Sequence, residues 1–166
     1  MHQTINIDMG EMAVGYNGTH IKTGSIGSCI VIVLYDYEAK IGGMAHAMLP
    51  SRGERQIDLI NEARAHINKT EFVARYADES VDRLIKEIEK IGGKRERLKA
   101  KLTGGARMFK VLNGDKDGIG YQNFESAKRR LQELGIPIEN EETGGTVGRV
   151  ADLNLENGLV DVSTKM

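Results

Sequence analysis

The chain has 166 residues and a nearly balanced charge, 23 Lys and Arg against 24 Asp and Glu, so no overall field attracts nucleic acid. Apolar residues make up 40% of the composition, which excludes wholesale disorder and predicts a single domain over residues 1–166. The single cysteine excludes an internal disulfide. Neither a signal peptide nor an apolar run long enough to cross a membrane is found, which predicts a cytoplasmic protein without membrane insertion.

The first fifty residues show the patterns of β-strands. Apolar and polar residues alternate across 3–16, which predicts one or two short strands interrupted at Gly10. A glycine-hinged turn is expected over 23–29, and the uniformly apolar stretch 30–35 predicts a central strand buried on both faces. A second strand is expected over 41–49, where a proline ends it.

The rest of the chain mixes helix and strand patterns without the regular order of a doubly wound sheet. The polar stretch 51–70 predicts a mobile insertion, and apolar residues at helical spacing predict helices over 76–91 and 124–134, the second with Asn123 as its N-cap. Further strands are expected over 98–102, 108–112, 136–142, 147–155 and 159–162. This irregular order favours an α+β fold.

The predicted hairpin suggests a role for the only cysteine. If its turn is centred between Tyr37 and Glu38, Cys29 and His46 face each other across the ladder, with Cβ atoms about 4.5–5.5 Å apart. An adjacent imidazole is what makes a thiol nucleophilic near neutral pH. On pattern alone, however, a lone cysteine before an apolar strand is more often a small buried apolar residue.

Residues near Cys29 could complete a catalytic site. The backbone amides of Gly27 and Ser28 could hold an oxyanion, and Thr23 could orient the far nitrogen of His46. A turn-stabilising hydroxyl explains Thr23 equally well. No Cys-x-x-Cys motif or closely spaced pair of histidines is present, so neither a metal nor a cofactor is expected.

A series of motifs follows in order along the chain. They are Gly27-Ser28-Cys29, Gly42-Gly43-Met44-Ala45-His46-Ala47-Met48-Leu49-Pro50, Tyr76-Ala77-Asp78, Lys101-Leu102-Thr103-Gly104-Gly105-Ala106-Arg107-Met108-Phe109, Ile119-Gly120 with Asn123, Gly135-Ile136-Pro137-Ile138 and Gly144-Gly145-Thr146-Val147-Gly148-Arg149. In this order they resemble the chemoreceptor glutamine deamidase family, CheD. The stretch 51–70 does not fit the resemblance, and this leaves substrate access open.

The resemblance implies a layered α/β/β sandwich similar to the catalytic domain of deamidating bacterial toxins. It implies a triad of Cys29, His46 and Thr23, with hydrolysis of selected glutamine side chains to glutamate on the cytoplasmic helices of methyl-accepting chemotaxis receptors. This protein-glutamine glutaminase reaction needs no cofactor or metal. The resemblance also implies binding to the phosphatase of the chemotaxis response regulator, with Phe109 as the expected contact.

Two alternatives stay open at this point. The chain could be a non-catalytic regulator that binds the phosphatase, in which case Cys29 would be dispensable for binding. It could also be another Cys–His amidohydrolase, such as a protease or a transglutaminase, in which case an added amine would be incorporated into the substrate without net deamidation.

Overall fold

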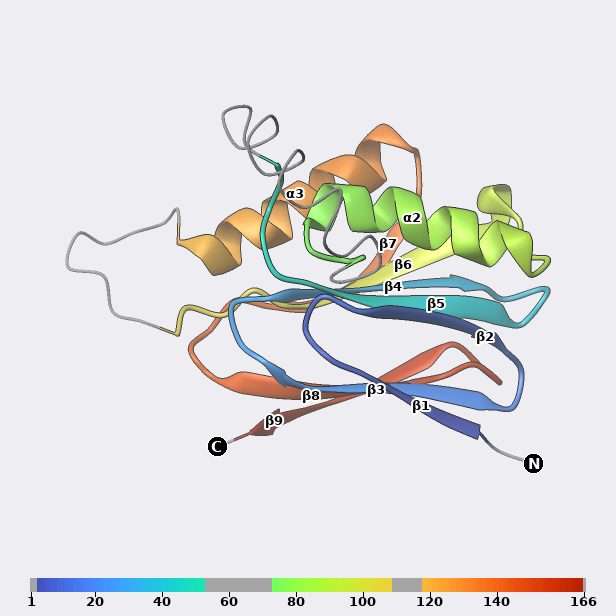
Figure 1. Cartoon of the computed structure of the whole chain (residues 1–166), viewed down its shortest axis with the longest axis horizontal. Coiled ribbons are helices and arrows are strands. Elements are labelled where there is room, and N and C mark those ends of the chain that lie inside the picture. Colours follow the sequence, from blue (N-terminus) through green and yellow to red (C-terminus); the bar gives the residue numbers. More distant parts are fainter. Residues whose placement is uncertain (1–2, 53–72, 109–117, 166) are drawn as a thin grey trace, which may run out of the picture.

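The computed structural model describes residues 3–52, 73–108 and 118–165, which form three stacked layers (Figure 1). The two α-helices of these residues lie over one face of a five-stranded sheet, and a four-stranded sheet packs against its other face. The predicted α+β fold and its α/β/β layering are therefore confirmed.

The five-stranded sheet has the order β2-β5-β4-β6-β7, and only its β6–β7 pair is parallel. The four-stranded sheet has the order β1-β3-β8-β9, with a parallel β1–β3 pair. The strands are β1 (Gln3–Ile7), β2 (Met12–Tyr16), β3 (Thr19–Ile26), β4 (Ile30–Asp36), β5 (Ile41–Ala47), β6 (Leu98–Gly104), β7 (Ile138–Thr143), β8 (Gly148–Asn154) and β9 (Leu159–Lys165). The helices are α2 (Ala77–Lys90), the 3-10 turn η1 (Arg95–Arg97) and α3 (Ile119–Glu133).

Strand β4 separates two hydrophobic cores, and all seven of its residues are buried. Side chains alternate between the faces of a strand. Ile30, Ile32 and Leu34 accordingly pack in the core under the helices, whereas Val31 and Val33 pack in the core between the two sheets. The prediction of a central strand covered on both faces is confirmed.

The two helices differ in how well the sequence predicts them. Helix α2 agrees with the predicted range 76–91, because its apolar side chains recur on one buried face. Helix α3 begins at Ile119 after the N-cap Gly118, so the prediction that Asn123 is the N-cap is wrong. Gly120 allows close packing rather than a turn, because a Cβ there would lie 2.7 Å from the carbonyl carbon of Gly105.

The predicted hairpin register is wrong by two residues. Asp36 pairs with Ile41 and Val31 pairs with His46, so the loop spans four residues and is centred one position later than expected. The carboxylate of Asp36 accepts the backbone N–H groups of Glu38 and Ala39, which stabilises this longer loop. A slip of two residues, unlike a slip of one, keeps each side chain on its predicted face.

The turn expected over 23–29 is shorter than predicted. Strand β3 continues to Ile26, so Thr23 lies within a strand. The register of β3 against β8 shifts between Thr23 and Ile26, where Ser25 has a φ of 54°, and this irregularity stands where the turn was expected.

The three C-terminal strands are confirmed with shifted ends. The predicted insertion 51–70 and the predicted strand 108–112 fall largely outside the described residues, although Met108 itself is not in a strand. No helix in the described ranges is long and apolar enough to cross a membrane.

Candidate functional site

The two sheets are joined by a hydrogen bond between His46 of β5 and Thr23 of β3. The His46 Nδ1 lies 2.7 Å from the Thr23 Oγ1, and the two residues are only 1% and 3% exposed. The same hydroxyl donates its single proton to the carbonyl oxygen of Ile7, 2.9 Å away. It must therefore accept from His46, which assigns the imidazole proton to Nδ1 and leaves a free lone pair on Nε2.

The Nε2 atom of His46 is buried and has no hydrogen-bond partner among the described residues. Buried polar atoms without a partner are uncommon in proteins and call for an explanation. Burial lowers the pKa of His46 to about 4, and the negative charge of Asp8 offsets this only in part. The imidazole is thus neutral near pH 7, and Nε2 can accept a proton.

Cys29 continues β4 by one residue. Its carbonyl oxygen accepts the N–H of Gly105 at 2.7 Å, which extends the β4–β6 ladder. By strand alternation, Cys29 shares a face with Val31, the residue directly opposite His46. Cys29 and His46 are therefore diagonal neighbours rather than direct partners, a relation in which Cα atoms are about 7–8 Å apart and long side chains still meet.

Cys29 is buried, with only 7% of the residue exposed. Burial raises its pKa, while the backbone N–H of Cys29 itself acts in the opposite direction. The shifts of Cys29 and His46 both disfavour a preformed pair of thiolate and imidazolium. The resting site therefore holds a neutral thiol and a neutral imidazole, and the proton moves only when the thiol attacks.

The turn before Cys29 is held against the segment that follows β6. The N–H of Ala106 donates to the carbonyl oxygen of Gly27 at 3.0 Å. Gly104 has a φ of 111°, and a Cβ there would collide with the carbonyl oxygen of Cys29. In the described part of the chain, the N–H groups of Ser28 and Cys29 donate to no backbone carbonyl, which makes them the candidate donors to a substrate oxygen.

Asn123 is a residue near this turn that sequence reasoning did not assign to the site. Its side-chain Nδ2 lies 2.9 Å from the carbonyl oxygen of Ser28 and 3.1 Å from that of Met48, and the residue is fully buried. Asn123 occupies the same buried face of α3 as Ala127 and Leu131. A polar residue on an otherwise apolar stripe is the sequence signal that could have identified it.

Phe109, the residue expected to contact a partner, lies outside the described residues. Its neighbour Met108 is 45% exposed and covers Gly27, where an added Cβ would lie 3.1 Å from the Met108 Cγ. An exposed apolar side chain therefore lies beside the turn that carries Cys29.

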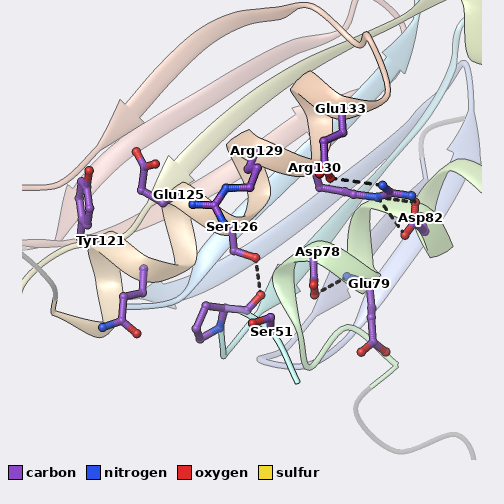
Figure 2. Close-up of a pocket in the computed structure, with 12 residues that line it drawn as sticks. Ser51, Asp78, Glu79, Asp82, Tyr121, Glu125, Ser126, Arg129, Arg130 and Glu133 are labelled. Carbon is purple, nitrogen blue, oxygen red and sulfur yellow. Dashed lines mark hydrogen bonds and ion pairs between the residues drawn. The ribbon is translucent and has the colours of Figure 1, made fainter. Parts of the chain in front are cut away.

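A separate groove of about 900 Å³ lies between α2 and α3 (Figure 2). Its lining is largely charged, and Arg130 of α3 binds Asp82 of α2 across it at 2.9 Å. Neither Thr23, Cys29 nor His46 lines this groove. Among the described residues, no group of three or more His, Cys, Asp or Glu side chains could hold a metal ion. Cys29 and His46 are thus the stronger candidate for catalysis.

The model of the family described as CheD chemotactic sensory transduction matches residues 48–164 of the chain. A chemoreceptor glutamine deamidase CheD of Halalkalibacterium halodurans is 38% identical over 165 residues, which cover 99% of this chain and 95% of the relative. The chain belongs to the CheD family. The resemblance inferred from the sequence motifs is confirmed.

Two further CheD relatives agree with this assignment. A probable chemoreceptor glutamine deamidase CheD of Pyrococcus abyssi is 39% identical over 160 residues, covering 96% of this chain and 91% of the relative. The chemoreceptor glutamine deamidase CheD of Thermotoga maritima is 39% identical over 152 residues, covering 92% and 86%. The CheD family match begins after His46, so the three candidate catalytic residues lie outside the matched range.

Proposed function

We propose that this CheD chain is a cysteine-dependent deamidase that converts selected glutamine side chains of methyl-accepting chemotaxis receptors to glutamate. The names of its relatives support the substrate class. The observation that carries the chemistry is the hydrogen bond from His46 Nδ1 to Thr23, which leaves a buried lone pair on Nε2. The reaction would take place in the cytoplasm, on the receptor's cytoplasmic helices.

In the first half of the proposed reaction, His46 Nε2 takes the Cys29 proton as the sulfur attacks the glutamine carboxamide carbon. The carbonyl oxygen gains negative charge, and the N–H groups of Ser28 and Cys29 donate to it. The C–N bond then breaks, and the imidazolium returns its proton to the departing ammonia. The products of this half are ammonia and a thioester between Cys29 and the receptor.

In the second half, His46 removes a proton from a water molecule that attacks the thioester carbon. The C–S bond breaks, Cys29 regains its proton from the imidazolium, and the receptor side chain leaves as glutamate. The Thr23 hydroxyl oxygen accepts a hydrogen bond from the Nδ1–H group throughout, so the imidazole keeps one orientation during both proton transfers. The overall change consumes one water and releases one ammonia.

The direct test incubates cytoplasmic fragments of a chemotaxis receptor with the wild-type protein and with Cys29→Ala. Peptide masses are then read for the gain of about one dalton that accompanies each change of Gln to Glu. We expect the wild type to produce this gain and Cys29→Ala to lose it by at least about 10³-fold, because no nucleophile replaces the thiol. Ser80→Ala, which truncates a small buried side chain of α2, is the control for general effects on the fold.

Two results would contradict the proposal. One is a mass gain that persists in Cys29→Ala. The other is an added amine that becomes attached to glutamine without net deamidation, which would indicate a transglutaminase.

The second candidate function is binding to the phosphatase of the response regulator. The exposed side chain of Met108 beside Gly27 favours it, because a partner bound there would also cover the Cys29 turn. In this case we expect Phe109→Glu to abolish the pull-down of the phosphatase and Cys29→Ala to preserve it. A loss of binding in Cys29→Ala alone would contradict this assignment.

A further inference from the structure

We propose that Asn123 of α3 is a positioning residue that aligns the turn carrying Cys29 with the strand carrying His46. Its amide donates to the carbonyl oxygen of Ser28 and to that of Met48, two residues after His46. The inference rests on the proposed deamidase function and adds a residue outside its triad.

The orientation of the Asn123 amide follows from its two partners. Both are carbonyl oxygens, which only accept hydrogen bonds, so the nitrogen end of the amide must face them and must use both of its protons. The reversed amide would bring its oxygen against two other oxygens. The Oδ1 atom is buried and has no hydrogen-bond partner among the described residues, so the two donated bonds alone set the orientation of this side chain.

The bond to Ser28 sets the direction of the amide that precedes the nucleophile. The peptide between Ser28 and Cys29 is planar and trans, so its C=O and its N–H point in opposite directions. When Asn123 holds the carbonyl oxygen of Ser28, it also fixes the direction of the Cys29 N–H. That N–H is a proposed donor to the oxyanion, and it stabilises the developing charge only if it points at that oxygen.

The bond to Met48 links the same side chain to the end of β5. His46 and Met48 are separated by one residue, and the Met48 N–H in turn donates to the carbonyl oxygen of Arg75. One side chain therefore connects the nucleophile's turn with the strand of its base. Among the described residues, the β4–β5 ladder also joins the two segments, where Ile30 pairs with Ala47.

Helix α3 itself is fixed against this turn. Gly120, nearly one helical turn before Asn123, packs so closely on Gly105 that a Cβ would lie 2.7 Å from the Gly105 carbonyl carbon. The Gly105 N–H in turn binds the carbonyl oxygen of Cys29 at 2.7 Å. Because α3 is anchored by this contact, Asn123 has a rigid base from which to position the turn.

The test compares Asn123→Ala with the control Ser126→Ala. Ser126 lies on the same helix and donates to the carbonyl oxygen of Pro50, so it ties α3 to the chain after β5 without reaching Ser28. Deamidation kcat and KM are measured together with the melting temperature. Amide hydrogen exchange is followed at residues 105–106, whose N–H groups donate to the carbonyl oxygens of Cys29 and Gly27 and so report on the turn.

For Asn123→Ala we expect kcat to fall about 10- to 100-fold while KM stays within about twofold, because the turn is misaligned rather than the substrate surface lost. We also expect the amides of residues 105–106 to exchange at least about tenfold faster, because their acceptors in the turn lose their fixed position. Ser126→Ala should leave kcat and this exchange within about twofold of the wild type. If Asn123→Ala does not fold, Asn123→Ser, which retains one donor, takes its place.

Unchanged exchange at residues 105–106 in a folded variant would overturn the proposal. So would a loss of kcat that only follows the folded fraction, or a failure of both Asn123 variants to fold, which would make Asn123 a requirement for folding. The exchange measurement does not depend on turnover. A wild type that does not deamidate would therefore refute the proposed function and leave the exchange data to decide the role of Asn123.

Discussion

The hairpin of β4 and β5 has a buried polar side chain at each end, and the two ends use it differently. At the loop end, Asp36 is fully buried, and its carboxylate accepts the N–H groups of Glu38, Ala39 and Lys94 and the guanidinium of Arg97. Burial raises the pKa of Asp36, but the hydrogen bonds from Arg97, Ala39 and Lys94 more than offset this and leave the pKa below its ordinary value.

At the open end, His46 is 1% exposed, yet only one of its two ring nitrogens has a partner among the described residues. Burial lowers its pKa to about 4, and the negative charge of Asp8 offsets this shift only in part. A buried carboxylate whose hydrogen-bonding capacity is fully used stabilises the fold, whereas an imidazole nitrogen with an unused lone pair can accept a proton. This difference gives Asp36 a structural role and His46 the proposed catalytic role.

The largest expected effect is on stability at the loop end. We expect Asp36→Ala to lower the free energy of unfolding by about 3 kcal/mol, because three backbone N–H groups and Arg97 lose their acceptor. Urea unfolding measures this change, and kcat should be unaffected at temperatures where the variant is folded. Asp36→Asn keeps one acceptor oxygen and should lose about half as much. A folded Asp36→Ala with reduced kcat would contradict the separation of the two ends.

The next effect concerns activity at the open end. We expect Thr23→Val to lower kcat about 10- to 100-fold, because the Nδ1 proton of His46 loses its acceptor and the imidazole loses its fixed orientation. Thr23→Ser should recover most of the activity. The control is Thr103→Val, a threonine that is equally buried and donates to the carbonyl oxygen of Glu142. Steady-state kinetics in which Thr103→Val loses as much kcat as Thr23→Val would refute the role of Thr23.

The smallest effect is a difference in pH dependence. In the unfolded chain His46 binds its proton with a pKa of about 6.5, and in the folded chain burial lowers the pKa to about 4. Between these values the unfolded state holds more protons, so the contribution of His46 to stability is lost as pH falls through this window. We expect a loss of about 1 kcal/mol between pH 7.5 and 5.5.

The matched variant for this measurement is His46→Gln, whose stability should change less over the same interval. The depressed pKa of Asp36 acts in a different window, because its contribution is lost only as pH falls below the ordinary value of 3.8. Urea unfolding at several pH values measures both. Equal slopes for the wild type and His46→Gln between pH 7.5 and 5.5 would show that His46 is not buried in its neutral form.

The periodicity of apolar residues in the sequence predicted the helix and the strand whose buried faces it reflects. The apolar stripe of α2 and the uniformly apolar β4 were assigned correctly, because a buried face leaves its period in the sequence. Cys29, His46 and Thr23 were proposed as a triad from the resemblance to the CheD family, and the hydrogen bond between Thr23 and His46 is consistent with that proposal.

The errors arose where distant residues decide the local structure. Asp36 caps the hairpin loop and also binds Lys94 and Arg97, which lie about 60 residues further along the chain, and a two-residue difference in register leaves no trace in the apolar pattern. Asn123 was expected to be an N-cap because Asn is favoured at that position, but the helix already begins at Ile119, with Gly120 inside it in close contact with Gly105. An asparagine near the start of a helix can be its N-cap or a buried residue in its first turns, and the sequence alone does not distinguish the two.

The sequence by itself determined the α+β class of this protein and its candidate nucleophile, because burial periodicity and a single cysteine can be read without coordinates, and its resemblance to the CheD family implied the three layers. Only the tertiary structure decided which nitrogen of His46 is free, since the single proton of the Thr23 hydroxyl goes to Ile7. It alone also brought Asn123 to the Ser28 carbonyl. Both depend on hydrogen bonds between segments far apart in the chain, and such bonds have no local signature.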